Sequence, residues 1–261
     1  MGVLNVTPDS FSDGGRFDDP ESAFRQAWQL MDEGADILDV GGESTRPGAA
    51  GVTVEEELRR ILPVVEVLAP HFPVSVDTSK AAVMRKVLPL GVAMINDVRG
   101  LREPEALAAV ASSSAAVCLM HMPGTPRTMQ DSPSYGDVTS EVGQFLRDRA
   151  LAVEAAGIGR ERIVIDPGFG FGKTLEHNLD LLRRLGEVAG LGWPVLVGLS
   201  RKSMLGRITG RDAGGRLHAS IAAAVLAVER GACMVRVHDV GPTRDALQVL
   251  RWLDHGRFSA E

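Results

Sequence analysis

Residues Ile163–Thr174, IVIDPGFGFGKT, show a pattern that recurs along the chain: a short apolar run that ends in a polar residue and is followed by a loop. The apolar run IVID is typical of a strand buried on both faces, and it ends in an acidic residue, Asp166. A loop follows in which three glycines alternate with Phe169 and Phe171. This order of strand, polar end and loop predicts that the loop displays functional groups beside the end of a parallel strand.

The final GKT of this stretch has the form of the end of a nucleotide-binding P-loop. The complete P-loop pattern needs a glycine five positions before Gly172, where this chain has Pro167. Proline has no backbone N–H to offer a phosphate. The dinucleotide pattern fails as well, because its third glycine would fall on Lys173. The sequence therefore leaves Asp166 and the glycine loop in need of another explanation.

The same apolar run recurs along the whole chain. Strands are predicted at residues 2–6, 36–40, 74–77, 94–98, 116–121, 163–166, 195–200 and 234–239. Helical patterns lie between them at 19–33, 53–68, 80–88, 104–111, 138–156, 175–188, 216–230 and 242–253. Eight alternations over about 250 residues predict an α/β fold, a (β/α)8 TIM barrel. An open doubly wound sheet is the alternative, but its glycine signature is missing after the first strand.

The composition restricts the class of protein. No break or linker interrupts the pattern, so residues 1–261 are predicted to form a single domain. A net charge of −6 argues against a general nucleic-acid surface. No apolar run is long enough to span a membrane, and the first residues do not resemble a signal peptide, so a cytoplasmic protein is expected. Cys118 and Cys233 are predicted to be buried, reduced thiols rather than a disulfide.

Polar residues follow each predicted strand. Catalytic groups of a TIM barrel come from the C-terminal ends of its strands and from the loops after them. Singly, each such residue could cap a helix or satisfy loop backbone, but their convergence on one rim favours an active site. The residues and loops concerned are Asn5, residues 7–15, residues 41–48, Asp77, Asn96, His121, Asp166, residues 200–203, Arg236 and His238.

These groups fall into two chemical sets. The first combines two carboxylates, an amide and an ammonium, which suit a flat heterocycle with alternating donors and acceptors. Its members are Asp77, Asn96, Asp166 and Lys202. The second set suits an oxyanion such as diphosphate. Its members are Asn5, Thr45, Arg236 and His238, with Ser203. Ligand spacing of the His/Cys type is missing, whereas a Mg²⁺ ion shared with a diphosphate remains compatible with the second set.

Eight motifs together resemble the dihydropteroate synthase family of folate biosynthesis, in order and over nearly the whole chain. They are NVTPDSFSDGG (5–15), DVGGESTRPG (39–48), SVDTSK (75–80), INDV (95–98), CLMHM (118–122), DPGFGFGK (166–173), GLSRKS (198–203) and RVHDV (236–240). The resemblance implies a TIM barrel that condenses a dihydropterin diphosphate with p-aminobenzoate. It also implies Mg²⁺, a homodimer and inhibition by sulfonamides, which mimic p-aminobenzoate.

The resemblance also implies residue roles. The pterin ring would be held by Asp77, Asn96, Asp166 and Lys202, the four residues expected to carry catalysis, with Met120 and Gly198 lining its slot. The diphosphate would be held by Asn5, Thr45, Arg236 and His238, with Mg²⁺ at Asn5. The p-aminobenzoate would be framed by Phe11, Asp13, Thr45, Arg46, Pro47, Phe171, Lys202 and Ser203. On this interpretation the final GKT of the opening stretch is a coincidence.

Three alternatives remain at the level of the sequence. A pterin-dependent methyltransferase would share the barrel and the pterin slot, but it would need no diphosphate site. A catalytically silent pterin-binding relative would bind the ring without turnover. A Schiff-base aldolase would use Lys202 as its nucleophile. The TRPG, SRKS and RVHD segments, which supply the second chemical set, weigh against the methyltransferase.

Overall fold

Within the residues that the structure describes, eight parallel strands form the centre of the molecule. The computed structural model describes residues 1–7, 20–44, 51–125 and 128–255. The strands are β1 (Gly2–Asn5), β2 (Leu38–Gly41), β3 (Val74–Asp77), β4 (Met94–Asp97), β5 (Ala116–Met120), β6 (Ile163–Asp166), β7 (Leu196–Val197) and β8 (Met234–Val235). Strands β1 to β6 pair in sequence order, and β7 pairs with β8. All pairs are parallel, as the buried apolar runs predicted.

Two single bridges close the strands into a barrel. Ile165 of β6 is bridged to Val195, directly before β7, and Gly2 of β1 is bridged to Val237, just after β8. The amino group of Met1 also donates to the Val235 carbonyl at 3.0 Å. The predicted (β/α)8 barrel is therefore confirmed. Its last two strands are shorter than the sequence pattern suggested.

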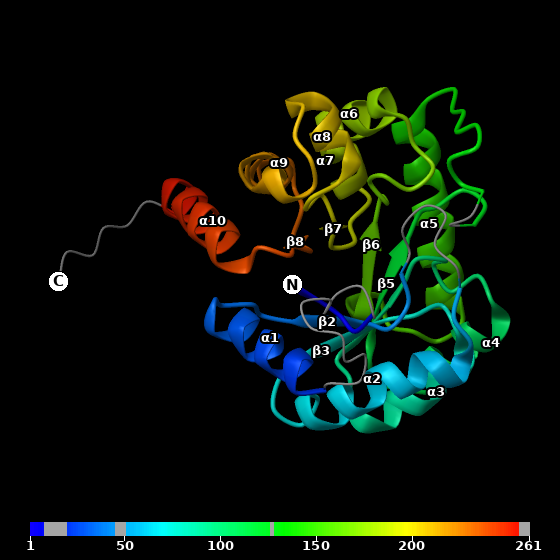
Figure 1. Cartoon of the computed structure of the whole chain (residues 1–261). Helices are drawn as coiled ribbons and strands as arrows, with labels where there is room; N and C mark the ends of the chain where they lie inside the picture. Colours follow the sequence, from blue (N-terminus) through cyan, green and yellow to red (C-terminus); the bar gives the residue numbers. More distant parts are fainter. Residues whose placement is uncertain (8–19, 45–50, 126–127, 256–261) are drawn as a thin grey trace.

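The helices surround the strands on the outside (Figure 1). They are α1 (Pro20–Asp32), α2 (Val54–Leu68), α3 (Ala81–Val87), α4 (Pro104–Ala111), α5 (Val138–Ala155), α6 (Leu175–Arg183), α7 (Leu185–Ala189), α8 (Ser203–Thr209), α9 (Leu217–Glu229) and α10 (Val240–His255). None of the helices in these described ranges is long and apolar enough to cross a membrane.

Alternation along each strand separates two cores. On β2, Leu38 and Val40 face outward and join the large core between strands and helices. Residues of the opposite parity, such as Met94 and Cys118, form a smaller cluster inside the barrel. Because successive side chains of a strand point to opposite faces, the polar residues of that parity also face the interior. The barrel interior therefore holds both this apolar cluster and the buried polar side chains of Asp39, Asp77 and Asn96.

Two local expectations were wrong, and one helix was not expected. The helix predicted at 175–188 is interrupted at Arg184 and becomes α6 and α7. Helix α8 was not predicted, because its seven residues contain Gly206 and are too few for a clear apolar period. Cys233 is exposed, since it lies in the turn before β8 rather than inside that strand, whereas Cys118 is buried as expected. Both cysteines are free thiols.

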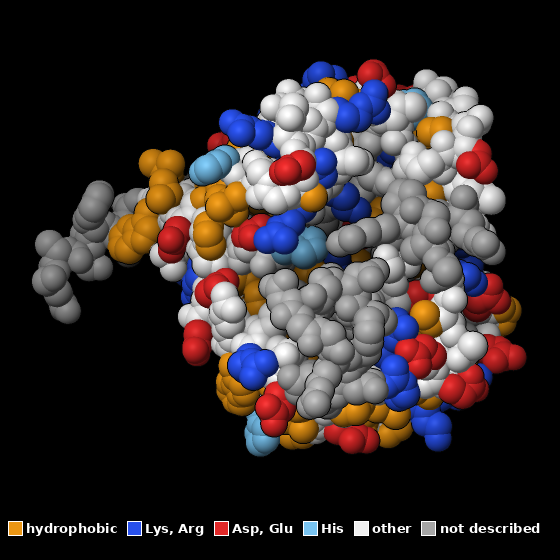
Figure 2. All heavy atoms as spheres, viewed as in Figure 1, with side chains coloured by type: hydrophobic (Ala, Val, Ile, Leu, Met, Phe, Trp, Pro, Cys, Tyr) orange, Lys and Arg blue, Asp and Glu red, His pale blue; other side chains and the backbone are white. Residues whose placement is uncertain are grey.

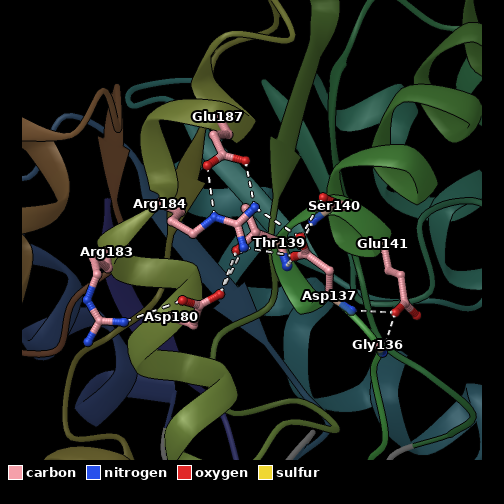
Figure 3. Close-up of polar contacts among 9 residues, drawn as sticks. All are labelled: Gly136, Asp137, Thr139, Ser140, Glu141, Asp180, Arg183, Arg184 and Glu187. Carbon is pink, nitrogen blue, oxygen red and sulfur yellow. Dashed lines mark hydrogen bonds and ion pairs between the residues drawn. The ribbon is translucent and has the colours of Figure 1, made fainter.

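An ionic cluster on the outer surface joins the start of α5 to α6 and α7 (Figure 3). Asp137 caps α5 by accepting from the backbone N–H groups of Thr139 and Ser140. The Arg184 guanidinium donates to Asp137 at 2.9 Å and to Glu187 at 2.8 Å. These bonds hold the pKa of the Asp137 carboxyl well below its usual range. Ion pairs this exposed contribute little stability, so the main effect is on the orientation of the helices.

Candidate active site

The strand register gathers the predicted polar residues at one end of the barrel. Asn5 is level with Gly41, Gly41 with Asp77, and Asp77 with Asn96. A Cβ atom at Gly41 would lie 3.5 Å from the Asp77 Cβ and 3.9 Å from the Asn5 Oδ1. Asn5 and Asp77 therefore approach each other over this glycine. On the other side of the barrel, Met120 is level with Asp166.

Arg236 connects the two chemical sets instead of belonging to one. Its Nε donates to Asp39 Oδ2 at 2.5 Å, and its Nη2 donates to Asp77 Oδ2 at 3.1 Å. Asp39 Oδ2 also accepts from Asn96 Nδ2 at 3.2 Å. One guanidinium thus lies between two buried carboxylates, and Asn96 is oriented by one of them. Removal of one partner from such a buried group leaves an uncompensated charge, which costs about 3–5 kcal/mol.

Asp39 was not among the predicted site residues. It is fully buried in the middle of β2, whereas the sequence argument considered only strand ends. Its signal was an acidic residue inside an otherwise apolar strand, which must be paired when it is buried. Burial and the nearby Asp39 charge raise the pKa of Asp77 to about 7, although Arg236 opposes this shift. The Asp77 carboxyl is therefore partly protonated near neutral pH.

Asp166 lies at the end of β6 and is 6% exposed. Its Oδ1 accepts from the Gly168 N–H at 2.7 Å. Burial raises the pKa of Asp166, while this hydrogen bond and the charges of Lys202 and Lys173 lower it. The carboxylate is thus fixed by the first turn of the glycine loop.

The glycine loop approaches its neighbours too closely for side chains at two positions. Gly168 has φ +69°, and a Cβ atom there would overlap the His121 carbonyl oxygen. Gly172 has φ +58°, and a Cβ atom there would overlap the Pro123 ring. Of the two phenylalanines, Phe169 is buried in the core, so only Phe171 is half-exposed at the rim.

Phe171, Met120 and Lys202 lie together at the rim. Phe171 packs against the cluster that contains Met120. The Lys202 Nζ lies over the Phe171 ring, 4.0 Å from its centroid, as in a cation–π contact. Gly198 also faces the interior, and a Cβ atom there would have no neighbour within 4 Å. This open space beside Gly198 is consistent with a slot for a flat ligand.

The loops after β7 and β8 are tied to each other. The His238 backbone N–H donates to Ser200 Oγ at 3.2 Å, and its Nδ1 lies 3.0 Å from the same oxygen. Arg201 donates through Nε to Asp239 at 3.0 Å and adopts φ +57°. These contacts fix the turn that places Lys202 before α8, whose first residue, Ser203, is exposed.

Five predicted residues lie outside the described part of the chain: Phe11, Asp13, Thr45, Arg46 and Pro47. The described residues bring together Asn5, Asp77, Asn96 and Arg236 on one side, and Asp166, Phe171 and Lys202 on the other. Basic, acidic and histidine side chains also gather near the centre of the face shown in Figure 2. Within the described ranges, no three His, Cys, Asp or Glu side chains are grouped as metal ligands.

Comparison with known proteins gives one consistent result. Residues 1–238 match the family described as pterin binding enzyme. The chain is 52% identical to dihydropteroate synthase of Escherichia coli (strain K12), covering 96% of this chain and 89% of that protein.

Solved structures agree. The Xanthomonas albilineans dihydropteroate synthase with 4-aminobenzoic acid is 52% identical, with a TM-score of 0.92, and the match covers 97% of this chain and 92% of that one. The Burkholderia cenocepacia dihydropteroate synthase complexed with 7,8-dihydropteroate is 48% identical, with a TM-score of 0.90 and coverage of 98% and 91%.

Proposed function

This chain belongs to the dihydropteroate synthases of the pterin-binding enzyme family, and from that premise we propose how its residues divide the work. The reaction joins the methylene carbon of a 7,8-dihydropterin diphosphate to the amino nitrogen of p-aminobenzoate. It gives 7,8-dihydropteroate and diphosphate. The observation that carries the residue assignment is the register that brings Asp77, Asn96 and Asp166 to one end of the barrel.

In this assignment the pterin ring lies between β3, β4 and β6. The Asp166 carboxylate accepts two parallel N–H bonds from the guanidine-like edge of the ring. Asn96 and Asp77 serve other ring heteroatoms, and Lys202 donates from the rim. Met120 and the open space beside Gly198 form the walls of the slot. Asn96 is already oriented by its bond to Asp39, which limits the entropy lost on binding.

The diphosphate is assigned to Asn5, His238 and Arg236, and to Thr45, which lies outside the described residues. The donor set at this end fits Mg²⁺: Asn5 offers one amide oxygen, and Mg²⁺ commonly takes one or two protein oxygens plus substrate phosphates and water. When bound there, Mg²⁺ would neutralise charge on the leaving diphosphate. Asn5 would hold the ion, while His238 and Arg236 would donate to the phosphate oxygens.

The p-aminobenzoate is assigned to the outer rim, with Phe171, Lys202 and Ser203. The other residues assigned to it are Phe11, Asp13, Thr45, Arg46 and Pro47. Its amine is neutral and has a free lone pair, so no general base is required before attack. The C–O bond to diphosphate breaks, the C–N bond forms, and the nitrogen then loses a proton to solvent. Positioning and electrostatic stabilisation supply most of the catalysis.

Three further assignments accompany this function. Residues 1–261 are proposed to act as one domain, in the cytoplasm and as a homodimer. The outer face of α10 supports the dimer, because Val249, Trp252 and Leu253 are 63%, 59% and 76% exposed. Equilibrium sedimentation at micromolar concentration should give twice the mass of the chain, and a monomer would contradict the dimer.

Two variants test the division between ring and diphosphate. Calorimetry would compare binding of the dihydropterin diphosphate with binding of 6-hydroxymethyl-7,8-dihydropterin, which lacks the diphosphate. Asn96→Ala should weaken both ligands about tenfold, as expected for a lost hydrogen bond to a buried site. His238→Gln should weaken only the diphosphate. Equal losses for both ligands in both variants would refute the division.

A further inference from the structure

Lys173, the lysine of the GKT segment, is a buried amine that the reaction as described does not use. It is 4% exposed. Its Nζ donates to the Gly168 carbonyl at 2.9 Å and to the Phe171 carbonyl at 3.0 Å, and lies 3.1 Å from His121 Nδ1. These three polar partners match in number the three N–H donors of an ammonium.

The two carbonyls lie on either side of the bend that displays Phe171. Gly168 begins the loop and Phe171 ends it, and the Phe171 N–H also donates to the Gly168 carbonyl at 3.1 Å. Other side chains also bind this loop: Gln130 donates to the Gly170 carbonyl at 2.8 Å, and Tyr135 donates to the Gly172 carbonyl at 2.8 Å. Asn178 accepts from the Gly170 N–H at 2.7 Å and donates to the Lys173 carbonyl at 3.3 Å. None of these three side chains bonds both Gly168 and Phe171. Lys173 bonds to both ends of the bend and therefore fixes its shape.

The His121 imidazole is the third partner of the Lys173 amine. Its ring lies 4.9 Å from Phe145 in a T-shaped contact and 6.1 Å from Tyr135. Burial and the Lys173 charge lower the pKa of His121 to about 3, so the ring is neutral. With Lys173 protonated, Nδ1 is the acceptor and the imidazole proton is on Nε2. The amine is thus in contact with an aromatic ring packed among its neighbours directly after β5.

Burial of a lysine costs free energy, and packing alone could be provided by an apolar side chain. Burial, with a smaller effect from Lys202, lowers the pKa of Lys173 to about 7, while Asp166 opposes the shift. A well-packed apolar side chain in place of a buried ion is often neutral or stabilising. The directional bonds of the amine, rather than stability, therefore account for its presence beneath the loop.

The bend also governs contacts on its outer side. The Phe171 ring faces the Lys202 Nζ at 4.0 Å. A Cβ atom at Gly170 would lie 3.1 Å from Lys202 Cδ, so the loop backbone is already close to that side chain. A small shift of the bend would move the ring relative to Lys202, the residue assigned to both substrates.

We propose that Lys173 is a positioning residue: it holds the Gly168–Phe171 bend and thereby sets the place of the Phe171 ring against p-aminobenzoate. This inference rests on the assignment of Phe171 to the second substrate. It gives the GKT segment a function that no nucleotide is needed to explain. Lys173 contacts the loop and not the reacting atoms, so its effect passes through Phe171.

A double-mutant cycle tests the inference. Steady-state rates would be measured for Lys173→Met, Phe171→Leu and the double variant, with each substrate varied in turn. Each single change should raise the KM for p-aminobenzoate about tenfold, as for loss of charge-assisted bonds or of an aromatic contact. The KM for the dihydropterin diphosphate should stay within about threefold in both, because Asp166 keeps its own bond to Gly168. The double variant should lose no more than Phe171→Leu alone.

The controls separate the possible failures. Lys86→Met, at an exposed lysine of α3, should leave both KM values unchanged. Lys173→Gln keeps two N–H donors on a shorter side chain, so its KM for p-aminobenzoate should lie between those of wild type and Lys173→Met. This variant replaces Lys173→Met in the test if Lys173→Met does not fold. Additive effects in the double variant, or a lower melting temperature with wild-type KM values, would overturn the role of Lys173. An unchanged KM in Phe171→Leu would instead overturn the assignment of Phe171 itself, and this inference with it.

Discussion

Replacement of Asp166 by Asn changes the proposed pterin contact with the smallest change in shape. Asp166 is 6% exposed, and its Oδ1 accepts from Gly168 N–H at 2.7 Å. Asn keeps the size and one oxygen for Gly168, but it presents an NH₂ group where the second carboxylate oxygen was. A donor then faces a donor on the guanidine-like edge of the pterin. The loss of a charged hydrogen bond costs about 1.5–3 kcal/mol, which corresponds to a roughly 10- to 100-fold lower kcat/KM.

The assay measures initial rates with the dihydropterin diphosphate varied at saturating p-aminobenzoate. Burial raises the pKa of Asp166, so its charge costs stability at neutral pH, and Asp166→Asn should unfold at no lower temperature than wild type. The loss of rate would then reflect binding and not folding. Asp148→Asn, at an exposed carboxylate on α5, is the matched control. A kcat/KM for Asp166→Asn within threefold of wild type would refute the pterin assignment.

Three further outcomes are expected. Arg236→Met leaves Asp39 and Asp77 without their ion-pair partner, so the free energy of unfolding measured in urea should fall by about 3–5 kcal/mol. Adding Asp39→Asn to this variant should restore part of the lost stability. Unchanged stability in Arg236→Met would exclude the buried ion pairs. The pKa of Asp77 is raised from 3.8 to about 7, so its contribution to stability is complete below pH 3.8 and is lost as pH rises through 7. Asp77→Asn should therefore gain stability relative to wild type as pH rises from 3.8 to about 7, and a constant difference would contradict the shift. A thiol reagent should label only Cys233 in the native protein and both cysteines in urea, since burial raises the pKa of Cys118; two labelled thiols in the native state would contradict this.

The barrel could be predicted because its signal is repeated. Apolar runs such as IVID and VSVD each end in a carboxylate, and parallel strands bring those ends to one rim. The strand parity then places Asp77, Asn96 and Asp166 inside the barrel without further information. The polar residue at each strand end is a local feature, and the apolar runs are a periodic one. Both can be recognised in a single sequence.

The missed features depend on contacts between distant segments. Asp39 is separated from Arg236 by 197 positions, so their ion pair has no local pattern. Lys173 belongs to a segment that looked like an incomplete P-loop, and its partner His121 lies 52 positions earlier. Helix α8 is short and contains Gly206, and it begins two residues after Arg201, which has a left-handed φ of +57°. Tertiary contacts determine each of these features.

The most direct test is the reaction of the purified protein with dihydropterin diphosphate, p-aminobenzoate and Mg²⁺. Both products would be followed in the same sample, by chromatography for the pteroate and by a coupled assay for diphosphate. The prediction is equimolar formation of 7,8-dihydropteroate and diphosphate, with no product when p-aminobenzoate is omitted. Tight binding of the dihydropterin diphosphate without either product would contradict the account and would indicate a silent pterin-binding protein.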